Sequence, residues 1–134
     1  MRECCILLVE DEELNRKLVK AVLSRARVDS VRAARVVDAS NLACARERLR
    51  DEDIDLVLLD MNLPDGSGMA LARELAAGTG LRPGRLKPVV VAVTASVLPQ
   101  ERAAAIEAGC DGFLDKPYAA ADLVAVVAGH LGDA

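Results

Sequence analysis

Aromatic residues are almost absent from this chain of 134 residues, which has no tryptophan, one phenylalanine (Phe113) and one tyrosine (Tyr118). It therefore lacks the aromatic platforms on which single-stranded nucleic acids stack. Its lysines and arginines are scattered, and the formal net charge is −4. Nucleic-acid binding depends on a basic patch that neutralises the phosphates. The sequence therefore argues against direct nucleic-acid binding.

Sulfur and imidazole ligands are also scarce. The cysteines Cys4, Cys5, Cys44 and Cys110 form no C-x-x-C pair, and His130 is the only histidine. Zinc sites usually combine such pairs with further cysteine or histidine ligands. We therefore expect no zinc site and interpret the cysteines as reduced thiols that behave as small buried hydrophobic residues.

Long apolar runs are missing as well, and none approaches the roughly 20 residues that a membrane span requires. The first run, Cys4–Val9, is short and passes directly into four acidic residues, which does not fit a secretory signal. With 52% hydrophobic and 28% charged residues, the composition is that of a globular protein in water. We expect a cytoplasmic protein without membrane contact, and a single domain over residues 1–134 with no output domain.

The sequence does contain an alternation of apolar runs and helical patterns. Strands that are buried on both faces of a parallel sheet read as short, continuous apolar runs. On this basis we predict strands at Cys4–Val9, Arg32–Val37, Ile54–Leu59, Val89–Val93 and Gly112–Leu114. The predicted helices are Glu13–Ala26, Ser40–Leu49, Met69–Ala77, Pro99–Ala108 and a last helix that ends near Leu131.

Residue patterns within the predicted helices indicate which face is buried and where some of the helices begin. In Glu13–Ala26, apolar residues at three- and four-residue spacing predict a buried stripe. This stripe consists of Leu14, Leu18, Ala21, Val22 and Ala26. Ser40 or Asp38 is expected to cap the second helix, and Pro99 is expected in the first turn of the fourth. Gly78–Pro88, which is rich in glycine and proline, is expected to form a loop.

Five strands alternating with five helices predict an α/β fold, with a doubly wound parallel sheet and helices on both faces. In such sheets the functional crevice lies outside the carboxyl ends of the strands. The polar residues directly at these ends are Glu10, Asp11, Asp60, Thr94 and Lys116. We therefore expect their side chains to meet at one edge of the sheet.

Three carboxylates in one crevice, Glu10, Asp11 and Asp60, repel one another unless positive charge is supplied. Lys116 supplies one charge, and a divalent cation is the natural source of the rest. Oxygen ligands without cysteine or histidine favour a hard ion such as Mg²⁺. Beside these cations, an ionised Asp60 can act as a nucleophile toward phosphorus, with Thr94 as a hydroxyl donor to the phosphoryl group.

Four segments of the chain resemble the signature segments of the receiver domains of bacterial response regulators in two-component systems. They follow the predicted strands in the order of the family, and the resemblance covers nearly the whole chain. The segments are Val9–Glu12, Leu58–Gly66, Val93–Ala95 and Leu114–Pro117. Each is weak alone, but the four together are specific. The resemblance implies a flavodoxin-like (βα)5 fold with a five-stranded sheet.

The resemblance also implies a role for each residue of the crevice. Asp60 would be the phosphoacceptor, and Glu10 and Asp11 would be the acidic pair that serves Mg²⁺. The backbone carbonyl of Asn62 would be a further metal ligand. On this view the chain is not a conventional enzyme, but it catalyses phosphoryl transfer to its own Asp60 and its own dephosphorylation.

Signalling roles follow from the same resemblance. Thr94 and Lys116 would contact the phosphoryl group, and Phe113 stands in the place of the family's switch aromatic, although it could equally be a plain core residue. The donor would be a histidine kinase or a histidine phosphotransfer protein. A downstream protein would dock on the fourth predicted helix, Pro99–Ala108, together with the last strand and the last helix.

Two other functions fit part of the pattern. Hydrolases of the haloacid dehalogenase type also form an aspartyl phosphate, but they carry a second acid where this chain has Asn62. A pseudo-receiver that only binds partners would be expected to have lost Asp11, Asp60, Thr94 or Lys116, and all four are present.

Two segments depart from the family pattern without touching these positions. Arg25–Arg35 lacks the glycine often found before the second strand, and Gly78–Pro88 is long for the family.

Overall fold

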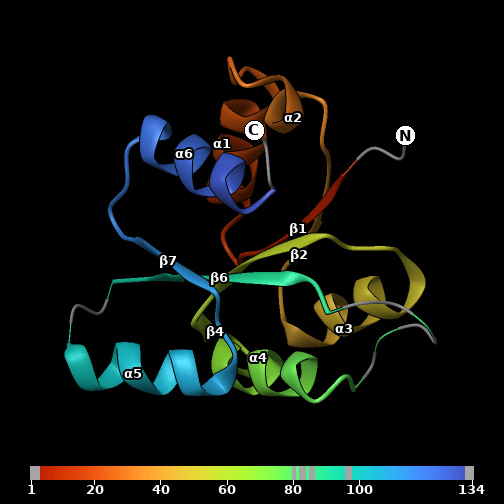
Figure 1. Ribbon diagram of the computed structural model, residues 1–134, viewed down its shortest axis with the longest axis vertical. Helices are drawn as coiled ribbons and strands as arrows, with labels where there is room; N and C mark the ends of the chain where they lie inside the picture. Colours follow the sequence, from red (N-terminus) through yellow and green to blue (C-terminus); the bar gives the residue numbers. More distant parts are fainter. Residues whose placement is uncertain (1–3, 80, 82–83, 85–86, 96–97, 132–134) are drawn as a thin grey trace.

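A five-stranded parallel sheet lies at the centre of the computed structural model, which describes residues 4–79, 81, 84, 87–95 and 98–131 (Figure 1). The strands are ordered β2-β1-β3-β6-β7, and every neighbouring pair is parallel. They are β1 (Cys5–Val9), β2 (Arg35–Ala39), β3 (Leu56–Asp60), β6 (Val89–Thr94) and β7 (Gly112–Asp115). An antiparallel pair, β4 (Asn62–Leu63) and β5 (Gly66–Ser67), follows β3 and is called the β4–β5 ribbon below.

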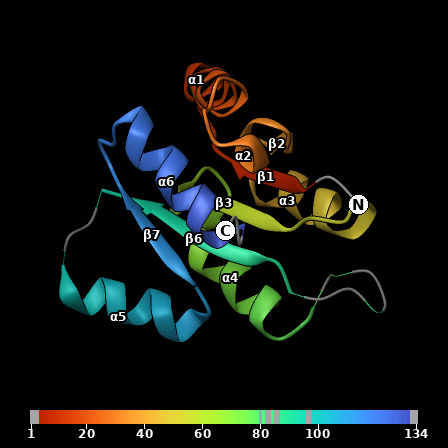
Figure 2. The ribbon, with the colours of Figure 1, turned by 45° about the horizontal axis from the view of Figure 1, so that its top comes forward.

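Helices cover both faces of the sheet, so the doubly wound α/β fold that the sequence predicts is confirmed. Helices α1, α2 and α6 lie on one face, and α3, α4 and α5 lie on the other (Figure 1 and Figure 2). Their bounds are α1 (Glu13–Ser24), α2 (Asp29–Arg32), α3 (Leu42–Asp51), α4 (Gly68–Ala76), α5 (Pro99–Ala108) and α6 (Ala120–His130). Among the described residues, none of these helices combines the length and the apolar run needed to cross a membrane.

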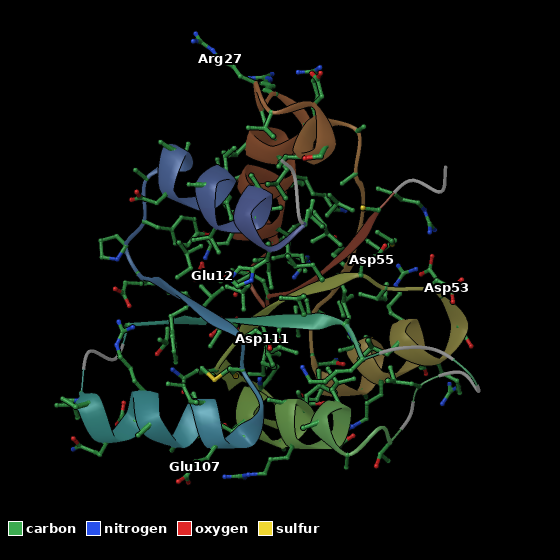
Figure 3. The ribbon with its side chains drawn as sticks, in the orientation of Figure 1. Glu12, Arg27, Asp53, Asp55, Glu107 and Asp111 are labelled. Atoms are coloured by element: carbon green, nitrogen blue, oxygen red, sulfur yellow. The ribbon has the colours of Figure 1, made fainter. Side chains whose placement is uncertain are left out.

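Carboxylates at the amino-terminal edge of the sheet are held by backbone groups (Figure 3). Asp55 Oδ2 accepts a hydrogen bond from the backbone N–H of Cys5 at 2.8 Å. Asp111 Oδ2 accepts one from the backbone N–H of Val90, also at 2.8 Å, and lies 3.1 Å from Lys87 Nζ. Each carboxylate thus joins the beginnings of two neighbouring strands, which is a structural role.

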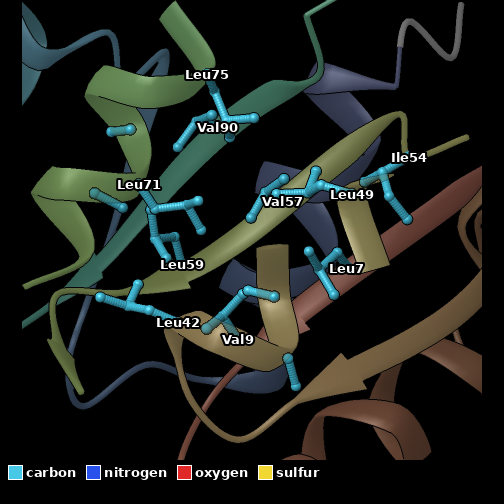
Figure 4. Packing of buried hydrophobic residues seen from close by; sticks show 14 of the residues in the cluster. Leu7, Val9, Leu42, Leu49, Ile54, Val57, Leu59, Leu71, Leu75 and Val90 are labelled. Atoms are coloured by element: carbon cyan, nitrogen blue, oxygen red, sulfur yellow. The ribbon is translucent and has the colours of Figure 1, made fainter. Parts of the chain in front are cut away.

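Alternate residues of the central strands build two hydrophobic clusters, one on each face of the sheet. Figure 4 shows the cluster under α3 and α4, where Leu7 and Val9 of β1 lie beside Val57 and Leu59 of β3. Ile6 and Leu8 point the other way, into the cluster under α1 and α6. Because a strand turns successive side chains to opposite faces, a strand buried on both sides must be continuously apolar. Because both clusters pack against the same parallel strands, the carboxyl ends of these strands lie together along one edge of the sheet.

The buried stripe of α1 differs from the predicted one. Val19 and Leu23 are buried, whereas Leu14 and Leu18 are 66% and 54% exposed. Ala26, which was also expected in the stripe, is buried but lies after the helix has ended. The helix carries apolar residues on two adjacent stripes. Their spacing does not decide which of the two faces the sheet.

The prediction of a strand at Arg32–Val37 is wrong at its start. Helix α2 ends at Arg32, and β2 begins only at Arg35. The short helix is held by Val31, which is fully buried, and by the guanidinium of Arg32, which donates to the Ala26 carbonyl at 2.9 Å. Tertiary contacts therefore fix one turn of helix where the local valines favour a strand.

The second predicted helix begins later and uses another cap. It starts at Leu42 rather than Ser40, and the Asn41 side chain accepts a hydrogen bond from the backbone N–H of Cys44 at 2.8 Å. Asp38, the other expected cap, lies in β2 and pairs with a lysine of α1. Asparagine, serine and aspartate cap helices about equally well, so composition alone does not choose among them.

Two further predictions hold in part. The four cysteines are free thiols, but only Cys5 and Cys110 are buried, while Cys44 is exposed. Of the predicted loop Gly78–Pro88, residues 80, 82, 83, 85 and 86 lie outside the described residues, and the others form neither helix nor strand.

Candidate functional site

Three carboxylates meet at the carboxyl edge of the sheet, as the sequence predicts. Glu10 and Asp11 follow β1, and Asp60 is the last residue of β3. One oxygen from each side chain lies within 4.8 Å of the others. Glu10 and Asp60 are only 6% and 5% exposed, whereas Asp11 is exposed. The cluster therefore has two carboxylates held away from water and one that is open to it.

Lys116 lies directly against Asp60. Its backbone N–H, at the end of β7, donates to the carbonyl of Thr94 at 2.9 Å. Its ammonium lies 3.0 Å from Asp60 Oδ2, and the backbone N–H of Asn62 donates to Asp60 Oδ1 at 3.0 Å. Each oxygen of the Asp60 carboxylate thus accepts a hydrogen bond, which stabilises its charged form.

The pKa shifts show how charge is divided within this group. Burial, followed by a hydrogen bond with Asp60, raises the pKa of Glu10 to about 7. Burial alone would also raise the pKa of Asp60, but hydrogen bonds with Glu10, the Asn62 N–H and Lys116 together lower it. Burial would lower the pKa of Lys116, but its ion pair with Asp60 raises that pKa instead. Of the two buried carboxylates, Asp60 is therefore the one whose ionised form is favoured.

Asn15 belongs to this site although no motif marked it. Its Nδ2 donates to Glu10 Oε1 at 2.7 Å from the first turn of α1. The neighbouring Arg16 donates from its guanidinium to the Glu10 backbone carbonyl at 2.8 Å. These contacts fix both the backbone and the side chain of Glu10. An asparagine in the first turn of a helix is too common for its sequence position to indicate such a role.

A cavity of about 560 Å³ opens beside Asp60 between α1 and α6. Its walls are mostly apolar and include Leu18, Val22 and Tyr118, while Asp60 and Lys116 lie on its lining. The two charged side chains of the site therefore border a mostly apolar cavity.

The donor set of the cluster suits a hard divalent cation. It consists of carboxylate oxygens from Glu10, Asp11 and Asp60, and such oxygens are the ligands that Mg²⁺ prefers. The exposure of Asp11 keeps one side of the cluster open to water and to a phosphate. A cation here would also neutralise the charge repulsion that helps to raise the pKa of Glu10. Asn62, another predicted ligand, is exposed at the start of the β4–β5 ribbon, two residues after Asp60.

The two predicted switch residues border one space. Thr94, at the end of β6, and Phe113, in β7, both line a second cavity of about 410 Å³, together with Asn62. Phe113 is half-buried, and the guanidinium carbon of Arg102 lies 5.0 Å from the centre of its ring. Arg102 also forms an ion pair with Asp115. Thr94 and Phe113 therefore line the same cavity.

The order of these residues along the strands is that of a known family. The family model of the response regulator receiver domain matches residues 6–128 of the chain. The chain belongs to this family. As a receiver domain, it has the fold and the residue order that the four sequence segments predict.

Individual relatives agree with this assignment over nearly their whole lengths. The polar-differentiation response regulator DivK of Brucella abortus is 29% identical over 129 residues, which are 96% of this receiver domain and 97% of the relative. A two-component response regulator from Clostridium difficile shares the fold with a TM-score of 0.82 at 23% identity, covering 97% of each chain.

A receiver domain of a sensor histidine kinase from Pseudomonas aeruginosa is 26% identical, with a TM-score of 0.78. The alignment covers 98% of this chain and 100% of that one. The crystal structure of the Pseudomonas domain has a magnesium ion coordinated in its active site cleft.

Proposed function

We propose that this receiver domain accepts a phosphoryl group on Asp60 in a Mg²⁺-dependent reaction. The observation that carries the proposal is the position of the Asp60 carboxylate, which is buried, paired with Lys116 and clustered with Glu10 and Asp11. A lowered pKa keeps this carboxylate ionised. A surface aspartate that merely ends a strand would need none of these partners.

In the proposed reaction, an oxygen of Asp60 attacks the phosphorus of the donor. The bond between phosphorus and the donor atom breaks, its electron pair leaves with the donor, and an aspartyl phosphate forms. The ammonium of Lys116, already 3.0 Å from Asp60, would neutralise one phosphoryl oxygen, and the Thr94 hydroxyl would donate to another. Positioning and charge neutralisation are the main contributions that a protein makes to such a transfer.

The acidic cluster would hold the metal through Glu10, Asp11 and Asp60, with the backbone carbonyl of Asn62 as a further ligand. When bound, Mg²⁺ supplies positive charge to the oxygens of the transferring group. The oxygen-only donor set supports this assignment. The magnesium ion in the cleft of the Pseudomonas receiver domain supports it independently.

The family indicates a histidine kinase or a histidine phosphotransfer protein as the donor. We place the reaction in the cytoplasm, where thiols such as the four free cysteines stay reduced. A hydrolase of the haloacid dehalogenase type is not favoured, because the family model is that of a receiver domain and Asn62 replaces the second acid. A phosphorylation-independent pseudo-receiver is not favoured either, since it would be expected to have lost Asp11, Asp60, Thr94 or Lys116, and all four are present.

Metal removal tests the proposal directly. Incubation with acetyl phosphate and Mg²⁺ is expected to add the mass of one phosphoryl group, and chelation of the metal should abolish this labelling. Asp11→Asn should weaken Mg²⁺ binding about tenfold or more, because a charged ligand is lost. Intact-mass spectrometry and calorimetric titration measure the two effects.

Glu13→Gln is the matched control for Asp11→Asn. It removes the same charge two residues away, from an exposed side chain that forms an ion pair with Lys17 on the surface of α1. We expect nearly unchanged Mg²⁺ affinity for this variant. Full labelling in the presence of a chelator would contradict the metal-dependent mechanism.

The phosphoryl group would act as a signal through Thr94 and Phe113. A hydrogen bond from Thr94 to the phosphoryl group would draw the end of β6 inward, and Phe113 would move within the cavity that both residues line. This movement would remodel the surface formed by α5, β7 and α6, where we expect a downstream protein to dock.

Thr94→Ala tests this coupling. The variant should still accept a phosphoryl group on Asp60, but it should lose most of the beryllofluoride-induced amide NMR shifts around Phe113. Thr79→Ala, in the turn that follows α4, makes the same chemical change away from the site and should keep the shifts of the wild type. Wild-type shifts around Phe113 in Thr94→Ala would show that the coupling does not run through Thr94, and the proposed switch role of Phe113 would be withdrawn.

A further inference from the structure

Asp65 joins the segment after Asp60 to a different helix. Its Oδ1 accepts a hydrogen bond from the backbone N–H of Leu42 at 2.8 Å, and its Oδ2 accepts one from Ala43 at 3.1 Å. These are the first two residues of α3, more than twenty positions earlier in the chain. The side chain of Asn41 already serves the third N–H of the helix. Asp65 therefore completes the amino-terminal cap of α3, although it lies in a different segment of the chain.

The turn that carries Asp65 is packed closely against α3. Asp65 lies between the two strands of the β4–β5 ribbon, in which Asn62 pairs with Ser67 and Leu63 with Gly66. Gly66 has a φ of +146°, and a Cβ at this position would lie 3.1 Å from Leu42 Cδ1. The ribbon has little room to shift while the two hydrogen bonds of Asp65 hold it.

The other end of the ribbon is tied to α4. The backbone N–H of Gly68 donates to the carbonyl of Met61 at 3.0 Å, and the Ser67 hydroxyl accepts from the N–H of Met69 at 3.1 Å. A two-stranded ribbon with two residues in each strand has little stability of its own. Its shape therefore depends on three anchors, which are β3 at Asp60, α3 through Asp65, and α4.

We propose that Asp65 is a positioning residue for metal binding, because it fixes the ribbon and thereby the Asn62 peptide relative to Asp60. The inference rests on the proposed function, in which the Asn62 carbonyl is a Mg²⁺ ligand. Without the anchor to α3, the ribbon would sample several arrangements. Metal binding would then have to order it, and this ordering weakens affinity.

The alternative is that Asp65 only caps α3. Asn41→Ala separates the two roles, since it removes the other side-chain cap of the same helix without touching the ribbon. Both kinds of variant are expected to lower the midpoint of thermal unfolding. Only a variant of Asp65 should also change the affinity for Mg²⁺.

The experiment is a calorimetric Mg²⁺ titration of the full chain, at a temperature where every variant is folded. Asp65→Ala should bind Mg²⁺ about tenfold more weakly than the wild type. Asp65→Asn loses the same charge but keeps an oxygen that can accept one N–H, so its affinity should lie in between. Asn41→Ala should bind with nearly wild-type affinity.

The possible outcomes separate this inference from the proposed function. Wild-type protein that fails to bind Mg²⁺ would overturn the proposed function itself. If the wild type binds but Asp65→Ala and Asn41→Ala show the same affinity, Asp65 is only a cap. If Asp65→Asn and Asp65→Ala lose the same amount of Mg²⁺ affinity, the effect is due to the charge of Asp65 rather than to its hydrogen bonds. This outcome would also overturn the positioning role. Should Asp65→Ala not fold, the comparison of Asp65→Asn with Asn41→Ala decides the question.

Discussion

Asp60→Asn is expected to abolish phosphorylation by acetyl phosphate, while the protein keeps its fold. An amide is not a nucleophile toward phosphorus, and it also removes the charge that pairs with Lys116 at 3.0 Å. The amide keeps the size of the carboxylate and can still accept the N–H of Asn62. Labelling should therefore fall to background in intact-mass spectra, whereas circular dichroism should show a folded domain.

Asp51→Asn is the matched control, since Asp51 is a highly exposed aspartate at the end of α3. This variant should be labelled at the wild-type rate. Undiminished labelling of Asp60→Asn would place the phosphoryl group on another side chain. Peptide mapping would then show whether that side chain is Glu10 or Asp11, the other acids of the cluster.

The candidate site could be predicted because it depends on strand ends. The central strands are buried on both faces and so appear in the sequence as apolar runs, which are Cys5–Val9, Leu56–Leu59 and Val90–Val93. Once the runs are aligned in a parallel sheet, the first polar residue after each run must lie at the same edge. Glu10 and Asp60 are found there, close together and buried.

Features that depend on tertiary contacts could not be predicted in this way. Helix α2 is fixed by the burial of Val31 and by a hydrogen bond from Arg32, neither of which leaves a periodic pattern. The Asn15 amide reaches Glu10 across the start of α1, and the Asp65 carboxylate reaches α3 from a turn. In both cases a common polar residue gains its role from a partner that the fold brings near.

Gly68→Ala is expected to damage both the fold and the site. A Cβ on Gly68 would lie 2.5 Å from the backbone carbonyl oxygen of Asp60, and 3.1 Å from Leu59 Cγ. Because the first contact is with backbone, no side-chain rotation can relieve it. The start of α4 and the end of β3 would have to move apart. We expect the free energy of unfolding to fall by about 2–3 kcal/mol, as in other overpacked interiors, and the rate of Mg²⁺-dependent labelling to fall with it.

Chemical denaturation and labelling of the same sample measure the two effects, and Gly129→Ala provides the control. Gly129 lies in α6, and a Cβ there would meet nothing within 4 Å. Alanine also favours a helix over glycine, so this variant should gain about 0.5–1 kcal/mol of stability. Both variants replace glycine by alanine, but Gly68→Ala is expected to lower the free energy of unfolding and Gly129→Ala to raise it. If Gly68→Ala kept the stability and the labelling rate of the wild type, the backbone of Asp60 would tolerate the shift that the new Cβ requires. The close contact between β3 and α4 would then not be needed for phosphorylation of Asp60.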